Sequence, residues 1–147
     1  MKKTFLLQGV KKFRDALMQS NAYPEFPNGC AKFSSFMLAK FLHEEMGIDK
    51  QNISYVFTGN SDSYNEEPFK IQTHGWLIVK GINVDITGYQ FPEISNEIVV
   101  RKTWYWGRKF VKRVTKFQYN EIELANEIHL KNYNKIIELI SNDYRTL

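Results

Sequence analysis

The spacing of the apolar residues changes near Gly47, and this change constrains the fold more than any other feature of the chain. Before Gly47, apolar side chains recur every three or four residues, which predicts amphipathic helices over residues 5–20 and 31–46. After Gly47, short runs of β-branched and aromatic residues alternate with turn residues, which is typical of strands. A helical pattern returns over residues 120–142, so helices flank a β-rich middle.

The β-rich middle predicts one antiparallel sheet. Lys80-Gly81 joins two of its runs as a tight hairpin turn, and segment 104–107 predicts a second hairpin. Residues 59–68 are polar and rich in turn residues, which predicts a surface loop. We therefore expect a single α+β domain over residues 1–147, with N-terminal helices packed on a sheet of four or five strands and a C-terminal helix. The expected strands cover residues 53–58, 71–79, 82–86, 97–103 and 109–117.

Composition excludes several classes of protein. A hydrophobic content of 43% with 15% aromatic residues excludes a disordered chain, because it suffices to build a core. The first residues have the basic and apolar character of a signal peptide, but Gln8 and Lys11 interrupt the apolar run. No run is long enough to cross a membrane. The single cysteine cannot form an intrachain disulfide, so we expect a cytoplasmic protein without membrane contact.

That cysteine, Cys30, lies where a nucleophile would be expected. It follows the turn Phe26-Pro27-Asn28-Gly29 and precedes a predicted helix, whose free backbone N–H groups lower the pKa of a thiol. His74 and Asp85 follow on two adjacent predicted strands. Because the hairpin centre lies near residue 80, position 74 pairs with position 86 or 87, which brings His74 close to Asp85.

These three residue types have the chemistry of a thiol catalytic triad. The histidine would take the proton of the thiol, and the carboxylate would hold the imidazole ring in orientation. The alternative is structural, because a lone cysteine is commonly a small core residue and a lone strand histidine commonly has no catalytic role. Asp85 is harder to explain in that way, because it lies between Val84 and Ile86 and a buried carboxylate needs a partner.

The same residues carry a resemblance. Phe26-Pro27-Asn28-Gly29-Cys30 with Ser34, then His74-Gly75-Trp76, then Asp85-Ile86-Thr87 with Gln90-Phe91, resembles the pattern G-x-C-x3-S, H-x-W, D-x-T-x2-Q-F. This pattern is similar to that of small bacterial and phage proteins of the transglutaminase-like and papain-like thiol enzymes. The resemblance covers residues 26–91 and implies Cys30 as nucleophile, His74 as base and Asp85 as the orienting residue. It implies Trp76 and Gln90 only as supporting residues, and it leaves open peptide cleavage, acyl transfer, deamidation or lost activity.

One departure from the papain-like pattern concerns the oxyanion. Papain-like peptidases carry a glutamine several residues before the cysteine, whereas Pro24 lies in that region here and the nearest upstream glutamine is Gln19. The backbone N–H of Cys30 is expected to be one oxyanion donor. The second donor could be the Asn28 side chain, Gln19 or another backbone group. The departure favours the transglutaminase-like branch.

Other chemistries have little support. Cys30, His43, His74 and His129 show no close paired spacing typical of a metal site, and we expect His43 and His129 to be solvated on helices. The chain has no glycine-rich phosphate loop. We therefore expect neither a metal nor a cofactor.

Segment 101–117 offers a different function. The formal net charge of the chain is +4, and seven basic residues without an acidic one lie between Arg101 and Lys116, so the rest of the chain is net acidic. Basic residues interleaved with aromatic ones bind phosphates and stack on bases, and they also suit an acidic protein. The segment could equally be a pair of half-solvated strands, or one wall of a thiol cleft. The candidate substrate-binding or anion-binding residues are Trp104, Trp106, Arg108 and Lys109.

The sequence thus predicts a cysteine-dependent hydrolase or acyltransferase. It would act on an amide of a peptide or protein substrate, either a peptide bond or a glutamine side chain, through an acyl-enzyme on Cys30. The loop over residues 59–68 would cover the site. The alternative is a module that binds nucleic acid or an acidic partner through segment 101–117, with an inactive thiol site.

Overall fold

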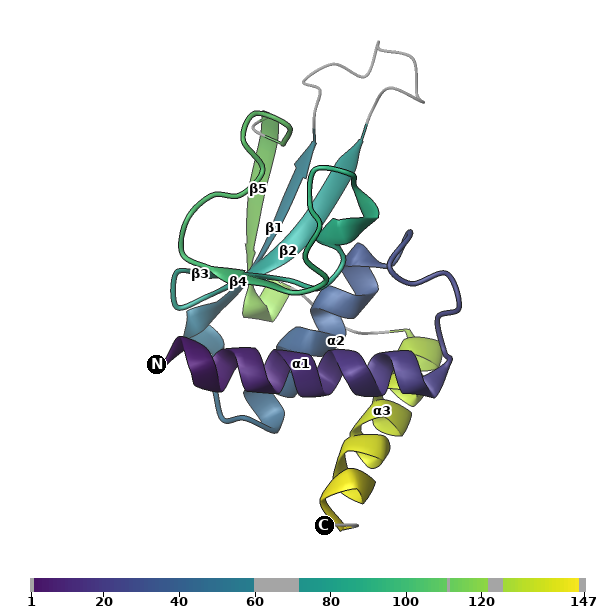
Figure 1. Cartoon of the computed structure of the whole chain (residues 1–147). Helices are drawn as coiled ribbons and strands as arrows, with labels where there is room; N and C mark the ends of the chain where they lie inside the picture. Colours follow the sequence, from purple (N-terminus) through teal and green to yellow (C-terminus); the bar gives the residue numbers. More distant parts are fainter. Residues whose placement is uncertain (1, 60–71, 111, 122–125, 146–147) are drawn as a thin grey trace.

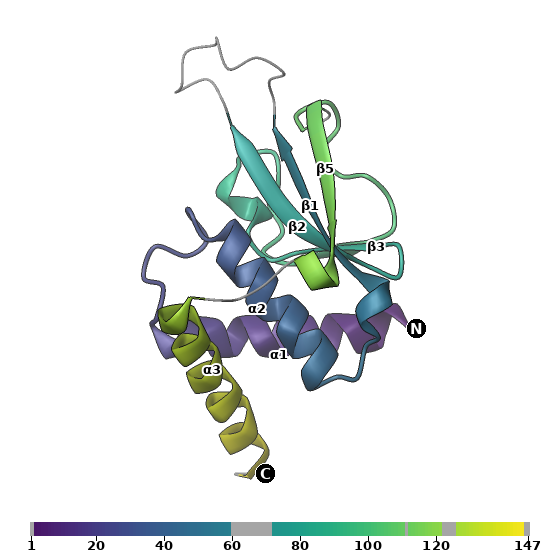
Figure 2. The same cartoon turned by 180° about the vertical axis from the view of Figure 1, so that it is seen from behind.

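The computed structural model describes residues 2–59, 72–110, 112–121 and 126–145 (Figure 1). In these residues, three α-helices pack beside one five-stranded antiparallel sheet, which confirms the expected α+β class. The three helices gather on one side and toward one end of the sheet, while β1, β2 and β5 extend beyond them (Figures 1 and 2). The elements are α1 (Lys3–Ser20), α2 (Ala31–Glu44), η1 (Lys50–Asn52), β1 (Ile53–Gly59), β2 (Thr73–Val79), β3 (Ile82–Asp85), η3 (Gly88–Gln90), β4 (Val99–Arg101), β5 (Lys112–Gln118), η4 (Tyr119–Glu121) and α3 (Glu127–Arg145).

The two N-terminal helices form where the apolar spacing predicts them. Helix α1 buries Leu6, Val10, Phe13 and Leu17 on one face, which is the three- and four-residue spacing of an amphipathic helix. Two other apolar residues of α1, Phe5 and Met18, are 49% and 43% exposed.

Helix α2 ends at Glu44, and the chain turns at Gly47, where the apolar spacing of the sequence changes. Gly47 has a positive φ of 71°, and the N–H of Ile48 donates back to the carbonyl oxygen of Leu42. Within α2, Met37, Leu38, Phe41 and Leu42 are buried in the main core against the sheet.

The sheet has the strand order β4-β3-β2-β1-β5. Strands β2 and β3 form the predicted tight hairpin, since Lys80 and Gly81 both have positive φ, as a type I′ turn requires. In its register Leu77 lies opposite Val84, so the same register continued places position 74 opposite position 87. The register of the hairpin thus agrees with the one that the sequence predicts.

The second predicted hairpin is wrong. Strands β4 and β5 lie at opposite edges of the sheet, where β4 pairs with β3 and β5 pairs with β1. Residues 102–110 therefore cross from one edge of the sheet to the other instead of turning back. The physical reason is burial, because Trp106 and Phe110 of this connection bury their rings against the sheet.

The two faces of β2 pack against different hydrophobic cores. Leu77 and Val79 belong to the main core, which also contains the buried faces of the three helices. Trp76 alternates with them and packs in a smaller aromatic core on the other face. The members of this smaller core are Val56, Trp76, Phe91, Trp106 and Phe110.

Several boundaries differ from those expected. The C-terminal helix begins at Glu127, because η4 occupies residues 119–121 at the position where a helical start was expected. The loop expected over residues 59–68 lies outside the described residues, apart from Gly59, which ends β1. Within the described part of the chain, no helix combines the length and apolar character that a membrane span needs.

Gly75 provides a test of this packing. A Cβ atom at Gly75 would lie 1.9 Å from the hydroxyl oxygen of Tyr55, which is buried against Phe36 of α2. We expect Gly75→Ala to lower the free energy of unfolding by about 1–3 kcal/mol in chemical denaturation, because the Tyr55 ring has to move. In a Tyr55→Leu background, the same substitution should cost less. An equal cost in both backgrounds would contradict this packing.

Candidate active site

The central feature of the candidate site is a buried pair formed by His74 and Asp85. The Nε2 atom of His74 lies 2.7 Å from Oδ2 of Asp85, and the two residues are only 1% and 2% exposed. Because a carboxylate only accepts hydrogen bonds, Nε2 carries the proton and donates it to Asp85. The predicted meeting of these two residues across the β2–β3 hairpin is therefore present in the structure.

The carboxylate of Asp85 has a donor on each oxygen besides the histidine. Oδ2 also accepts a hydrogen bond of 2.6 Å from the hydroxyl of Tyr105, and Oδ1 accepts one of 3.0 Å from the backbone N–H of Thr87. Burial, followed by the charge of Asp85, raises the pKa of Tyr105 well above its ordinary value, so its hydroxyl stays protonated and donates. These donors stabilise a charged carboxylate away from water.

Aromatic rings enclose the imidazole of His74. Its ring centroid lies 5.1 Å from that of Trp106, 5.3 Å from that of Phe91 and 5.9 Å from that of Phe110. The Nδ1 atom of His74 is buried and has no hydrogen-bond partner among the described residues, and the same is true of Nε1 of Trp106. The ring therefore has one nitrogen held by Asp85 and one free to accept a proton.

Cys30 is the residue that directly precedes α2, as the sequence predicts, but its thiol is not activated in this arrangement. The side chain is buried and Sγ donates to the carbonyl oxygen of Asn28 at 3.3 Å. Burial, and then the charge of Glu25, raise the pKa of the thiol above its ordinary value. This direction is opposite to the lowering expected from a helix N-terminus, because loss of hydration outweighs it here.

Cys30 and His74 are both described, and no hydrogen bond joins them. Cys30 belongs to the main core beside the helices, whereas His74 lies on the opposite face of β2, with Trp76. The two groups nevertheless approach the same end of the domain. The start of α2 lies beside η3 in both views, and η3 begins three residues after Asp85 (Figures 1 and 2). Phe26 contacts Tyr89 of η3, with ring centroids 6.4 Å apart.

The predicted supporting residues have diverse surroundings. Trp76 donates from Nε1 to Asn83 at 3.0 Å and packs on the His74 ring. The side chain of Asn28 is exposed, Gln19 is exposed on the last turn of α1, and Gln90 is half-buried at the end of η3. The N–H of Cys30, expected as an oxyanion donor, makes a long bond of 3.4 Å to the carbonyl of Pro27.

The four candidate binding residues of segment 101–117 separate into buried and exposed groups. Trp106 is 3% exposed and is part of the His74 enclosure, so its ring is not on the surface. Trp104 is 42% exposed and packs on Trp76, while Arg108 is exposed. Lys109 forms an ion pair with Glu93 at 3.0 Å and donates a hydrogen bond to Gln72 at 2.6 Å.

The two histidines expected to be solvated are both in contact with other groups. His43 is hydrogen-bonded through Nδ1 to the carbonyl of Ile48 at 2.7 Å. His129 stacks on Phe33 at a centroid distance of 3.8 Å and is hydrogen-bonded to Tyr23. Both predictions failed because helix position alone does not report which neighbouring element covers a side chain. No cluster of three or more metal-ligating side chains occurs in the described residues.

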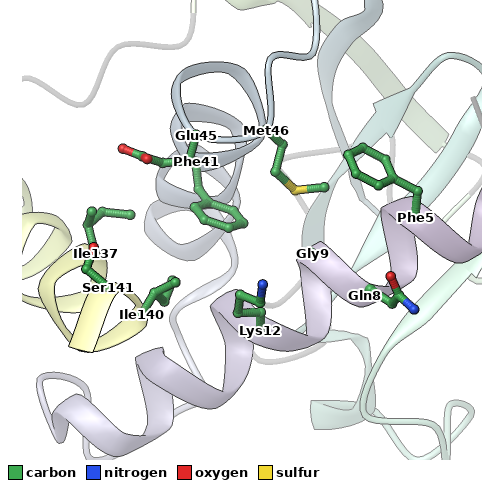
Figure 3. Close-up of a pocket in the computed structure, with 10 residues that line it drawn as sticks. All are labelled: Phe5, Gln8, Gly9, Lys12, Phe41, Glu45, Met46, Ile137, Ile140 and Ser141. Carbon is green, nitrogen blue, oxygen red and sulfur yellow. The ribbon is translucent and has the colours of Figure 1, made fainter. Parts of the chain in front are cut away.

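A separate cavity of about 470 Å³ lies between α1, the end of α2 and α3 (Figure 3). Apolar and polar side chains both line it, and the polar ones are Gln8, Lys12, Glu45 and Ser141. None of the predicted site residues lines it. The cavity is therefore distinct from the His74–Asp85 pair.

Sequence reasoning missed Tyr105, Phe91 and Phe110 as parts of the site. Tyr105 lies 20 residues after Asp85 in segment 101–117, which was interpreted mainly from its basic residues. The available signal was the density of aromatic residues around Trp106, which is high for an exposed connection. Such density indicates a buried layer as readily as it indicates a binding surface.

The raised pKa of Cys30 gives a prediction. We expect the pH midpoint of iodoacetamide labelling to lie above that of a free thiol, because the folded protein holds Cys30 protonated. The Glu25→Gln variant should lower this midpoint, since it removes a negative charge that opposes the thiolate. Asp15→Asn, which removes an exposed carboxylate of α1, should leave it unchanged. Equal midpoints for Glu25→Gln and the wild type at low salt would exclude the charge effect.

The same shift affects stability at high pH. A thiol with a pKa raised by folding favours the folded state below the pKa of the unfolded thiol and loses that contribution as pH rises above it. Alkaline pH is therefore the range in which Cys30 should weaken the fold.

Comparison with known proteins supplies no further assignment. No protein-family model, no curated protein and no solved structure matches this chain. The case for a function therefore depends on the residues and contacts described above.

Proposed function

We propose that the protein is a cysteine-dependent hydrolase or acyltransferase that acts on an amide. The observation that carries the proposal is the difference between the two nitrogens of the His74 ring. Nε2–H donates to Asp85, whereas Nδ1 has no hydrogen-bond partner among the described residues and can act as a base. A structural histidine would be expected to satisfy both nitrogens when it is this deeply buried. An unpaired Nδ1 in a dry enclosure suits a group that receives a proton from a nucleophile.

The reaction would proceed in two steps. The Sγ atom of Cys30 forms a bond to the amide carbon, and its proton passes to Nδ1 of His74. The C–N bond then breaks as His74 returns that proton to the leaving amine, which leaves an acyl-enzyme on Cys30. Water or an amine gives a proton to Nδ1 and forms a bond to the acyl carbon, and the C–S bond breaks as that proton passes from Nδ1 to Sγ. Throughout, Asp85 holds the ring and stabilises the imidazolium without taking its proton.

The proposal requires Cys30 and His74 to come closer than they are in the described arrangement. The contact between Phe26 and Tyr89 supports such an approach, because it couples the turn before Cys30 to η3, which follows the Asp85 strand. Substrate binding in this region would have to displace part of the aromatic enclosure. Closure of that kind assembles catalytic groups only when the substrate is present.

The finer fold assignment and the cellular setting belong to the same proposal. A cysteine at a helix start, packed against an antiparallel sheet that carries histidine and aspartate on adjacent strands, supports a transglutaminase-like or papain-like core. The proposed substrate is a peptide or protein that presents a peptide bond or a glutamine side chain. The proposed location is the cytoplasm, where a single free thiol stays reduced.

An acyl-enzyme assay tests this proposal. We expect 4-nitrophenyl acetate to acetylate Cys30, identified by peptide mass spectrometry as a thioester that hydroxylamine removes. His74→Ala should slow the acetylation by about a hundredfold or more, because general-base assistance is worth about that much. His43→Gln, which changes a histidine outside the candidate site, should react like the wild type. Equal acetylation rates of wild type and His74→Ala would exclude His74 as the base.

A second candidate, a module that binds an acidic partner, is supported by a groove beside β4. The groove has a volume of about 640 Å³, and its charged lining residues are Lys3, Arg101 and Lys102, with no acidic residue among the lining residues. Its floor is apolar, through Leu7, Ile98, Val99 and Val100. It contains no aromatic side chain for base stacking, which favours an acidic peptide over a nucleic acid.

Charge reversal tests the second candidate. Arg101→Glu with Lys102→Glu should weaken binding of fluorescent polyglutamate by roughly tenfold at low salt, because attraction becomes repulsion. Lys11→Glu with Lys131→Glu, a reversal of equal charge on exposed helix positions, should have a smaller effect. Fluorescence anisotropy measures both. Tighter binding of an oligothymidylate than of polyglutamate would instead favour nucleic acid.

A further inference from the structure

We propose that Tyr105 is a positioning residue of the candidate site and sets the strength of the His74–Asp85 hydrogen bond. The effect of Tyr105 on catalysis rests on the proposed thiol function, whereas its effect on the His74–Asp85 hydrogen bond does not. The geometry is direct, since the Tyr105 hydroxyl and His74 Nε2 donate to the same carboxylate oxygen, Oδ2 of Asp85, at 2.6 Å and 2.7 Å.

Two donors on one oxygen compete for its electron density. The hydroxyl of Tyr105 withdraws charge from Oδ2, so the bond from His74 is weaker than it would be with Asp85 alone. The same contact fixes the rotation of the carboxylate, because the N–H of Thr87 holds Oδ1 and Tyr105 holds Oδ2. Tyr105 therefore controls both the direction and the strength of the acceptor behind His74.

The position of Tyr105 is itself fixed by its surroundings. Its ring lies 5.6 Å from that of Trp76 and 5.1 Å from that of Trp106. Asn83 holds the connection before it, since its Nδ2 donates to the carbonyl oxygen of Arg101 at 3.1 Å and to that of Thr103 at 3.3 Å. The Oδ1 of Asn83 in turn accepts from Trp76. One polar residue of β3 thus links the ring beside His74 to the start of the crossing connection.

The end of this connection is anchored as well. Nε1 of Trp104 donates to the carbonyl of Gly107 at 2.8 Å, and Lys109 binds Glu93 and Gln72. The connection between β4 and β5 therefore acts as a cover for the pair, with Tyr105 as its polar contact and Trp106 and Phe110 as its apolar contacts. This role explains the buried aromatic residues of segment 101–117 without a nucleic-acid ligand.

The matched variants are Tyr105→Phe and Tyr89→Phe. Each removes one hydroxyl from a buried or half-buried tyrosine, but the Tyr89 hydroxyl accepts from Arg14 and does not contact the pair. With Tyr105→Phe, His74 is the one side-chain donor to Oδ2 of Asp85 that remains among residues 2–59, 72–110, 112–121 and 126–145, and Oδ2 becomes a stronger acceptor for it. A merely structural role of Tyr105 would lower the melting temperature and leave the His74 hydrogen bond unchanged.

The experiment is proton NMR of the protein with 15N-labelled histidine. We expect the Nε2–H proton of His74 to move downfield in Tyr105→Phe and to keep its wild-type position in Tyr89→Phe. The acetylation rate of Cys30 should fall about tenfold or more in Tyr105→Phe across the pH profile, because the ring is held less precisely. An unchanged Nε2–H signal in Tyr105→Phe overturns the inference, whatever its stability.

Two further outcomes keep this inference separate from the proposed function. If Cys30 is never acetylated but the Nε2–H signal moves, the thiol function fails and the action of Tyr105 on the pair stands. If Tyr105→Phe does not fold, the action of Tyr105 on the pair is tested in the wild-type protein. Its Tyr105 hydroxyl proton should exchange slowly and show a nuclear Overhauser effect to the Nε2–H of His74, and the absence of that effect overturns the inference.

Discussion

Burial of the Asp85 charge is the constraint on which the organisation of this sheet face depends. A carboxylate that is 2% exposed would be strongly destabilising without hydrogen bonds, so the chain has to bring donors to both of its oxygens. His74 comes from the neighbouring strand, Thr87 from the next turn and Tyr105 from the connection that follows β4, the edge strand paired with β3. The same connection continues across the sheet to β5, and its Trp106 and Phe110 become part of the second core.

The sheet separates two environments with opposite chemistry. On the helix side, Cys30 is a buried thiol whose pKa is raised, in contact with the carbonyl oxygen of Asn28. On the other side, His74 has a partner on Nε2, while its Nδ1 has none in the part of the chain that the structure describes. Each half has the features of a triad component, and η3 with the turn before Cys30 is the region where the halves approach. The proposed base and orienting residue are thus in direct contact, whereas the proposed nucleophile is hydrogen-bonded to Asn28.

Local patterns predicted the parts of the fold that depend on neighbouring residues. The β2–β3 hairpin and its register follow from two short apolar runs around Lys80-Gly81, and the contact of His74 with Asp85 follows from that register. Helix α2 ends at Glu44, and the turn at Gly47 just after it has an equally local cause, the tolerance of glycine for positive φ. The partner of β4 could not be predicted in this way, because pairing with β3 or β5 is decided by which rings become buried. Tyr105 was missed for the same reason, since its role arises from a contact between distant segments.

Because aromatic rings enclose His74, the proposed catalysis has to include the free energy needed to open this enclosure. If the arrangement that joins Cys30 to His74 makes up 1% of the folded population, it lies about 2.7 kcal/mol above the resting one, and the apparent affinity for a substrate falls a hundredfold. A substrate that contacts Phe91, Trp106 or Phe110 in the open state would recover this energy, because exposed aromatic surface would be covered again. A small ester covers little of that surface and would react from the small open population, whereas a peptide covers more of it and would enlarge that population. The aromatic enclosure would then select for large substrates by the same interactions that keep the histidine dry at rest.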